Sequence, residues 1–372
     1  MQLIQLVVKG FKSIHPDGQL INFGDVTVLL GPNGAGKSNL VSFLKMLNFI
    51  AREELQIFIG KQGGADALLH YGSKHTDAIE FSLILKQEAE NTILSTYSVS
   101  LTHGMPDKLF IAREQVTRQQ VGEKTGQKYF LDNGNSESGL FKDRRTTSKI
   151  LLSALGSIRT YQFHDTSDTS RIRANGYIDD SRYLRSDAGN LAAFLKMMKT
   201  GPKTKRYYER IVHHIQRVMP QFGDFDLETI TGNDLYVRLN WKDISNDFLF
   251  GPHQISDGTL RFMALASLLL QPPTILPDTI VLDEPELGLH PAAIAELAGM
   301  IRMASKNARI VVATQSTRLV DEFNAGEIVV VERDEMRDCS VFKRLNETEL
   351  GDWLSRYSLS ELWEKNVLGG LP

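Results

Sequence analysis

Residues 31–38, with the sequence GPNGAGKS, have the types and the spacing needed to hold phosphate groups. They fit the pattern G-x-x-x-x-G-K-[ST] of nucleotide-binding loops. Glycines let backbone N–H groups approach a phosphate closely, Lys37 can neutralise the β- and γ-phosphates, and Ser38 can offer its hydroxyl to Mg²⁺. We therefore expect a nucleotide and Mg²⁺ at this loop. The residues expected to contact them are Asn33, Gly34, Ala35, Gly36, Lys37, Ser38 and Asn39.

The segments on either side of this loop fit a strand–loop–helix arrangement. Residues 26–30 (VTVLL) are apolar and partly β-branched, which predicts a buried strand, and residues 39–52 carry apolar side chains at helical spacing. The positive end of that helix's dipole would point at the bound phosphates. This context disfavours a chance glycine-rich turn.

Two carboxylates follow a second apolar segment, residues 279–285 (TIVLDEP). At the end of a buried strand, Asp283 can hold Mg²⁺ directly or through water, and Glu284 can act as general base toward an attacking water. Lys37 and Asp283 lie far apart in the sequence, so we expect two separate parts of the chain to form one active site.

Residues 256–261 (SDGTLR) begin a stretch that predicts a helix running to about residue 270. Ser256 can cap this helix, and the free N–H groups at its start form a potential second anion site. Taken alone, the segment is better explained by an ordinary capped helix. Its place just before the acidic strand favours the anion site.

Bulk composition indicates a globular protein and excludes several classes. The 372 residues are 42% hydrophobic and 23% charged, and the net charge of −3 gives no global signature of polyanion binding. A single cysteine, Cys339, excludes a disulfide framework and a Cys-rich zinc site. The start lacks the features of a signal peptide, and no apolar run is long enough to span a membrane, so we expect a cytoplasmic protein without membrane contact.

The order of expected elements predicts an α/β fold. Strands alternate with helices in the last third, which favours a largely parallel sheet, while residues 78–131 read as an antiparallel β-meander. We expect an N-terminal lobe with the phosphate loop (1–165), a helical insertion (166–232) and a C-terminal lobe (233–372). Within these, the expected segments include strands at 158–165 and 234–241 and helices at 147–155, 190–200, 203–219, 291–305 and 316–324.

Together these motifs resemble the ABC-type ATPases of the SMC/RecF branch, and more narrowly the small AAA-type ATPases without long coiled coils. The resemblance covers the chain end to end. It is carried by residues 31–39, 256–261, 279–291, 313–316, 163–167 and 357–370.

The resemblance implies a P-loop ATPase of the ABC head type that binds ATP and Mg²⁺ as a homodimer. Two protomers would sandwich two ATP molecules, and Ser256 and Gly258 of one would complete the phosphate site of the other. Asp283 and Ser38 would hold the metal. Binding of ATP would close the dimer and hydrolysis would release it.

Two positions depart from the family pattern. ABC ATPases usually carry a histidine after the strand that follows the acidic one, and here the residue is Gln315. Glutamine can hydrogen-bond a γ-phosphate but cannot become cationic. We expect Glu284 and Gln315 to be the catalytic residues, with the substitution affecting hydrolysis more than binding. The family's glutamine loop falls near Gln162, His164 and Asp165, without a clear match.

Basic residues cluster in the helical insertion, where they fit two explanations equally well. They can form a patch that follows the phosphates of DNA or RNA, or a solvated face paired with nearby aspartates. The residues are Arg171, Arg173, Arg182, Arg185, Lys203, Lys205 and Arg206 with Tyr207 and Tyr208, and a second group of Lys142, Arg144 and Arg145.

The function that fits these motifs is a Mg²⁺-dependent ATPase that acts as a switch on nucleic acid or on an effector protein such as a nuclease or toxin, in DNA repair or phage defence. Two alternatives stay open. One is an ATP sensor with little turnover, and the other is the ATP-binding subunit of a transporter. A nuclease of the overcoming-lysogenization-defect type is disfavoured, because too few residues follow Ser316 for its nuclease domain.

Overall fold

The protein is described by a computed structural model that covers residues 1–88, 92–131, 133–246 and 248–370. Its centre is a six-stranded sheet in the order β18-β17-β3-β16-β15-β8, in which all pairs are parallel except β17 with β18. All residues of β3 and β15 are buried, and so are most residues of β16. This is expected for parallel strands that are covered on both faces. The strands are β3 (Val26–Leu30), β8 (Ile158–Tyr161), β15 (Thr279–Asp283), β16 (Arg309–Thr314), β17 (Ile328–Asp334) and β18 (Cys339–Arg344).

A second sheet is antiparallel and confirms the expected β-meander. Its order is β2-β1-β4-β5-β6-β7, and every neighbouring pair runs antiparallel. Alternate side chains of its long strands are buried, which is typical of a sheet with one face on a core. The strands are β1 (Gln2–Lys9), β2 (Gln19–Asn22), β4 (Ala78–Gln87), β5 (Ile93–Gly104), β6 (Lys108–Gln120) and β7 (Gln127–Phe130).

Helix α1 (Lys37–Ile50) follows the phosphate loop and lies between the two sheets. Its apolar side chains share one core with side chains of both sheets, for example Leu44 with Phe81 and Val311. Burial on nearly all sides explains why this helix is so rich in Leu, Phe and Met. The same core includes the first face of the central sheet, so α1 is fixed between its own strand β3 and the meander.

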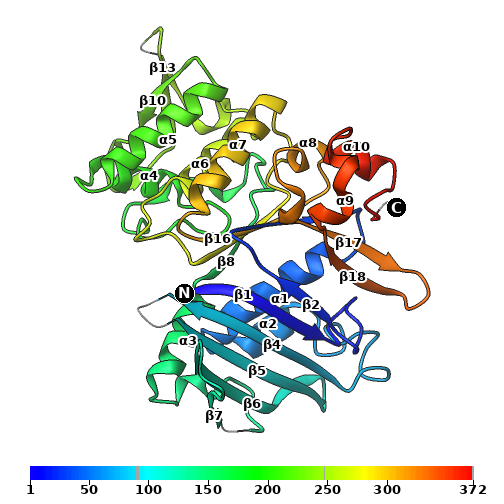
Figure 1. Cartoon of the computed structure of the whole chain (residues 1–372). Coiled ribbons are helices and arrows are strands. Elements are labelled where there is room, and N and C mark those ends of the chain that lie inside the picture. Colours follow the sequence, from blue (N-terminus) through cyan, green and yellow to red (C-terminus); the bar gives the residue numbers. More distant parts are fainter. Residues whose placement is uncertain (89–91, 132, 247, 371–372) are drawn as a thin grey trace.

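The other face of the central sheet is covered by helices from the second half of the chain. Val28, Leu282 and Val312 of the sheet share a core with these helices, which form the upper half of the molecule in Figure 1. The helices are α4 (Leu191–Thr200), α5 (Lys205–Val218), α6 (Asp257–Leu269), α7 (Pro291–Ala304), α8 (Thr317–Val320) and α10 (Leu359–Glu364).

Smaller elements complete the chain. Two three-stranded sheets have the orders β10-β13-β14 and β11-β12-β9. The remaining elements are α2 (Leu55–Lys61), α3 (Thr146–Gly156), α9 (Glu347–Leu354), β9 (Gly176–Tyr177), β10 (Phe222–Asp226), β11 (Thr229–Ile230), β12 (Asn233–Val237), β13 (Asn240–Asp243), β14 (Leu249–Phe250) and the short 3₁₀ turns η1 (Gly139–Phe141), η2 (Arg171–Arg173), η3 (Pro252–Gln254) and η4 (Ala325–Glu327).

Three sequence expectations about single elements were wrong in extent. Residues 234–241 are not one strand, because the Asn240 N–H donates to Arg238 O (3.0 Å) and the turn separates β12 from β13, which belong to different sheets. The strand expected at 158–165 ends at Tyr161, and the helix expected at 316–324 is reduced to α8. The proposed three-part division of the chain stays a prediction, although the β11–β12 pair bridges its boundary at residue 232.

Candidate nucleotide site

The phosphate loop connects the end of β3 to the start of α1, as its sequence predicts. Gly34 and Gly36 have φ angles of 82° and 115°, in the left-handed region that favours glycine. A Cβ added to Gly34 would meet no atom within 4 Å, so the space in front of this residue is open. Both glycines therefore adopt the backbone conformation required by a cradle of N–H groups.

The loop is supported from behind by β18 and by the residues after β1. A Cβ on Gly36 would lie 2.0 Å from Ser340 Oγ, so no larger residue fits at this position. Ser340 Oγ lies 2.5 Å from Ala35 O and 2.6 Å from Ser13 Oγ, and Asn39 Nδ2 donates to that same Ser13 Oγ (2.6 Å). The rear of the loop is thus a hydrogen-bonded layer, while Asn33, Gly34 and Ser38 are exposed on the other side.

Lys37 connects the two separated parts of the site. Its Nζ donates to Gly31 O (2.6 Å) and to Pro32 O (2.9 Å), and the side chain is buried. Burial lowers the pKa of Lys37, and the nearby carboxylates of Glu284 and Asp283 act in the opposite direction. The structure therefore brings the lysine of the phosphate loop close to the acidic end of β15, as the sequence led us to expect.

Asp283 ends β15 and is nearly buried. Gln162 Nε2 donates to its Oδ2 (2.5 Å), and a ring nitrogen of His164 lies 2.9 Å from its backbone O. Both partners follow β8, which pairs in parallel with β15 and therefore ends at the same edge of the sheet. An oriented carboxylate with an amide beside it is suited to a hard cation such as Mg²⁺.

Glu284 and Gln315 lie side by side just after their two strands. Glu284 has a φ of 46°, its N–H donates to Ala313 O (2.8 Å), and its side chain is partly exposed. Gln315 Nε2 is 3.4 Å from Glu284 Oε1. A non-glycine residue in the left-handed region carries backbone strain of about 1 kcal/mol or more, which is often found at functional sites.

A third carboxylate, Glu286, lies behind this pair and was not singled out from the sequence. It accepts a hydrogen bond from Thr314 Oγ1, and its other oxygen, Oε2, has no hydrogen-bond partner among the described residues. Burial raises the pKa of Glu286. Thr314 Oγ1 also accepts from Ser316 N (2.9 Å), so this group links the segment after β15 to the segment after β16.

Ser256 caps α6, as predicted, with its Oγ accepting from Thr259 N (3.3 Å). Ser256 is exposed, and Gly258 packs so closely on residue 288 that an added Cβ would lie 2.3 Å from Gly288 O. Among the described residues, neither hydrogen-bonds to the phosphate loop of the same chain.

Two arginines hold this helix start in place. Arg173 is buried and donates to Thr166 O (2.8 Å), to Asp257 Oδ1 (2.7 Å), and to backbone carbonyls of Pro252 and Ile255. Arg261 donates to the carbonyls of Phe163, His164 and Leu287. Both arginines therefore connect α6 to the loop that follows β8.

These residues fit ATP with Mg²⁺. The open glycine cradle, the lysine at its base, the exposed Ser38 and the oriented Asp283 supply the donors and oxygen ligands that a metal–triphosphate needs. Ser38 and Asp283 are the residues that would hold the metal, with Gln162 beside them.

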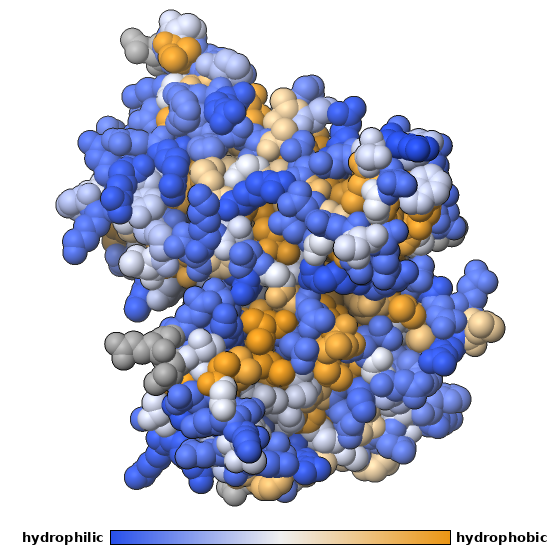
Figure 2. All heavy atoms as spheres, in the orientation of Figure 1, coloured by the Kyte–Doolittle hydropathy of each residue, from blue (hydrophilic) through white to orange (hydrophobic). Residues whose placement is uncertain are grey.

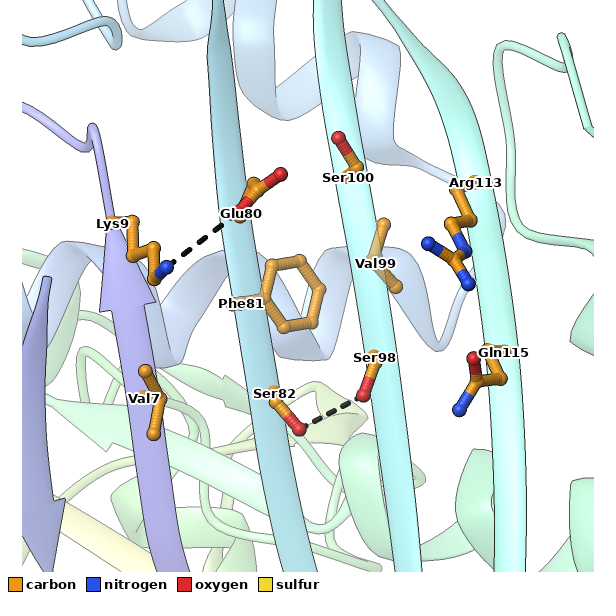
Figure 3. A pocket seen from close by; sticks show the side chains of 10 residues that line it. All are labelled: Val7, Lys9, Glu80, Phe81, Ser82, Ser98, Val99, Ser100, Arg113 and Gln115. Carbon is orange, nitrogen blue, oxygen red and sulfur yellow. Dashed lines mark hydrogen bonds and ion pairs between the residues drawn. The ribbon is translucent and has the colours of Figure 1, made fainter. Parts of the chain in front are cut away.

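The face of the molecule shown in Figure 2 is mostly hydrophilic, with hydrophobic side chains gathered over β1 and β4. A cavity of about 260 Å³ lies on the outer face of this sheet. Figure 3 shows that its charges are partly compensated, with Lys9 near Glu80 (3.9 Å) and Ser82 bonded to Ser98 (2.9 Å). No residue of the phosphate loop lines it, so it is separate from the nucleotide site.

The basic residues of the insertion do not form one patch. Arg173 is a buried structural residue, so its inclusion in a surface patch was wrong. Arg171 and Arg185 are exposed and line one cavity, whereas Lys203 and Arg206 line another. Arg145 pairs with Asp143 (3.3 Å), which favours a solvated face for that group.

Comparison with known families assigns the chain to one of them. Residues 26–321 match the family described as "AAA domain, putative AbiEii toxin, Type IV TA system". The chain belongs to this family. The match extends over most of the chain and includes both β3 and the segment after β16. The resemblance to ABC- and SMC-like ATPases is thereby confirmed.

Two solved structures have a similar fold. The SmcHead bound to the C-winged helix domain of ScpA is 16% identical, with a TM-score of 0.57, covering 94% of this chain and 99% of that chain. An Smc head domain with an extended coiled coil, bound to the C-terminal domain of ScpA derived from Pyrococcus furiosus, is 18% identical, with a TM-score of 0.54 and coverages of 95% and 98%. No protein with curated function matches. No described helix is long and apolar enough to cross a membrane.

Sequence reasoning missed functional residues whose roles depend on distant pairing. Gln162 was one of three unresolved candidates for the glutamine loop, and only the pairing of β8 with β15 places it against Asp283. Ser340 supports Gly36 from the far end of the chain. Glu286 carried a usable signal, since it is the third carboxylate in a run of four residues after an apolar strand.

Proposed function

We propose that the protein is a Mg²⁺-dependent ATPase whose protomers close in pairs around ATP. The observation that carries this proposal is the position of Lys37, which lies at the phosphate loop and within electrostatic reach of Asp283, Glu284 and Glu286. A lysine that meets both the phosphate loop and the acidic strand end marks a complete half-site for a metal–triphosphate.

Each residue of this half-site has a distinct role. Backbone N–H groups of the loop and Lys37 bind and orient the phosphates, and Mg²⁺, when bound by Ser38 and Asp283, neutralises phosphate charge. Glu284 accepts a proton from the attacking water as general base. Gln315, beside Glu284, donates a hydrogen bond toward the γ-phosphate or this water.

The second half of each site would come from the partner protomer. Ser256 is exposed and Gly258 partly exposed at the start of α6, and among the described residues neither hydrogen-bonds to the phosphate loop of the same chain. A helix N-terminus with free N–H groups can cover the outer face of a γ-phosphate. Dimer closure would then depend on the triphosphate, which makes the protein a switch.

Size-exclusion chromatography with light scattering tests this proposal directly. The Glu284→Gln protein should shift from monomer to dimer when ATP and Mg²⁺ are added, because binding is retained while hydrolysis is blocked. Adding Ser256→Arg should abolish the shift, whereas the matched control Ser355→Arg, at the end of α9, should not. A Glu284→Gln protein that binds ATP and stays monomeric would contradict the sandwich.

We propose that the switch acts in the cytoplasm on nucleic acid or on an effector protein, in DNA repair or phage defence. A sensor with little turnover is the second candidate, favoured by Gln315, which cannot supply the positive charge of an imidazolium. The family description, which names a toxin and a toxin–antitoxin system, is consistent with an effector partner. Turnover measured with and without oligonucleotide separates the two candidates: stimulation supports the switch, and turnover that stays very low supports the sensor.

A further inference from the structure

A second cavity lies beside the free edge of β8, the outermost strand of the central sheet. It has a volume of about 470 Å³, within the range typical of small-ligand sites. Its walls come from three parts of the chain: the outward face of α1, the whole of β8, and the loop residues Arg171 and 185–187. The fixed core between α1 and the sheet makes two of these walls rigid.

The walls of this cavity are strongly basic. Five of its residues are cationic and only Asp187 is anionic, which gives the lining a net charge of +4 in a chain whose total is −3. The cationic residues are Lys45, Arg52, Arg159, Arg171 and Arg185. By contrast, the cavity in Figure 3 contains a Lys9–Glu80 pair and one further arginine.

Arg185 pairs with Asp180 (2.7 Å), but the other cationic side chains are less well neutralised within the described part of the protein. Lys45 on α1 and Arg52, just after the end of that helix, are exposed and form no ion pair within the part of the chain that the structure describes. Arg171 lies 3.6 Å from Asp187, and both side chains are well exposed, so this pair is weak. Like charges gathered in a concave site repel one another, and a bound anion relieves that repulsion.

The remaining lining groups suit an anion that carries phosphates. Arg159 lies with its guanidinium 5.0 Å from the centre of the Tyr183 ring, which orients its planar donor face. Thr160, which also lines the cavity, has a buried hydroxyl with no hydrogen-bond partner among the described residues. Guanidinium groups bind phosphate through two parallel hydrogen bonds, and several converge here.

We propose that this cavity is a second phosphate-binding site, separate from the phosphate loop, that takes the phosphates of a free nucleotide or of a nucleic-acid strand. None of its residues belongs to the loop at 31–38. The excess of cationic residues in the cavity, its volume and its unpartnered hydroxyl all favour the binding of phosphate groups.

The position of the cavity also connects it to the nucleotide site. Ser186, which lines the cavity, accepts a hydrogen bond at its backbone O from Gln162 N (3.2 Å), and the Gln162 side chain holds Asp283. Lys45 lies on α1, whose first residue is Lys37, and Arg52 follows the end of that helix. An occupant of the cavity would therefore lie against α1, which begins at the phosphate loop, and against the segment that is bonded to Gln162. The coupling between the cavity and the nucleotide site rests on the proposed ATPase function. The binding of phosphates in the cavity does not depend on that function.

Binding is tested in the full chain carrying Lys37→Ala, so that the phosphate loop does not contribute. The probes are inorganic tripolyphosphate and a fluorescein-labelled 20-nucleotide DNA, single-stranded or duplex. The cavity variant is Lys45→Glu with Arg52→Glu, and the control is Lys124→Glu with Lys306→Glu, an equal charge change at exposed lysines outside the cavity. Thermal unfolding of all variants confirms that each is folded.

We expect the cavity variant to lose at least about tenfold in affinity and the control to bind as the parent does. Loss for tripolyphosphate alone identifies a free nucleotide as the occupant. Loss for the DNA, with a salt dependence reduced by about two phosphate contacts, identifies a strand. Equal binding of every probe by cavity and control variants overturns the proposal.

The coupling has its own readout in the protein with Lys37 intact. The effective probe should change the ATP turnover of the wild type and of the control variant but not of the cavity variant. A wild type that binds the probe yet hydrolyses no ATP refutes the proposed function and leaves the site standing. Equal binding of every probe by the cavity and control variants, together with normal ATP turnover, refutes only the phosphate-binding site.

Discussion

Gln162 Nε2 donates a hydrogen bond to Asp283 Oδ2 at 2.5 Å, joining the edge strand of the central sheet to the carboxylate expected to hold Mg²⁺. The bond depends on the parallel pairing of Tyr161 with Leu282, which ends β8 and β15 at the same level. Groups that orient a metal ligand tune the affinity of the metal, commonly by 10- to 100-fold when removed. We therefore expect Gln162 to position Asp283, and of the three candidates for the family's glutamine loop it is the one whose side chain bonds to that carboxylate.

We predict that Gln162→Ala weakens the apparent affinity for Mg²⁺ by about tenfold and lowers kcat, with little change in the affinity for ATP. The reason is that Asp283 loses the donor that orients it, while the phosphate loop is untouched. Mg²⁺ titrations of turnover and of nucleotide binding measure the two effects separately. Gln221→Ala, at an exposed site, is the control, and equal Mg²⁺ dependence in both variants would contradict the role of Gln162.

The two glycines of the phosphate loop offer a matched pair of substitutions. Gly34 and Gly36 both have positive φ, so alanine at either costs about 1–2 kcal/mol of backbone strain. Only at Gly36 would the new Cβ collide with another residue, Ser340. We expect Gly36→Ala to abolish ATP binding and to lower the melting temperature clearly more than Gly34→Ala. Equal losses of thermal stability would mean that Ser340 does not fix the loop.

The buried Arg173 provides a test of the exposed helix start. Removing its guanidinium leaves the carbonyls of Thr166, Pro252 and Ile255 without a donor, at a cost of about 1–3 kcal/mol for each group that water does not reach. We predict that Arg173→Ala lowers the free energy of unfolding by several kcal/mol, measured in urea. It should also prevent ATP-dependent dimerisation, because Ser256 loses its support. Arg182→Ala, an exposed arginine of the same segment, should change neither property.

The fold and much of the site were predictable because their signals are local. The pattern of residues 26–38 by itself specifies a buried strand, a glycine turn and a helix start, and all three are present. The acidic end of β15 and the cap at Ser256 are equally local. Each of these predictions needs only a few neighbouring residues.

What sequence reasoning missed depends on contacts between distant segments. Ser340 meets Gly36, and Gln162 meets Asp283, through strand pairings that no short pattern specifies. The break between β12 and β13 was missed for a related reason. Residues 234–241 alternate as one strand would, but tertiary pairing with β9 and with β10 draws the two parts into different sheets.

The raised pKa of Glu286 predicts a pH dependence of stability. Burial favours its neutral form, so the folded chain retains this proton at pH values where the unfolded chain has released it. Stability is therefore lost as the pH rises from the ordinary glutamate pKa of 4.5 through the raised value. Glu286→Gln keeps an acceptor for Thr314 and removes the ionisation. We expect this variant to melt at a higher temperature than the wild type above that window, and to differ little below it.

Thermal unfolding from pH 4 to pH 8, without nucleotide or Mg²⁺, measures this difference. Glu335→Gln, an exposed glutamate on the hairpin between β17 and β18, removes the same charge without changing a buried group, and its melting curve should follow the wild type. A Glu286→Gln protein whose advantage is the same at both ends of the range would show that packing, rather than ionisation, causes the change. A carboxylate whose charge is made costly by burial is well placed to respond when Mg²⁺ binds nearby.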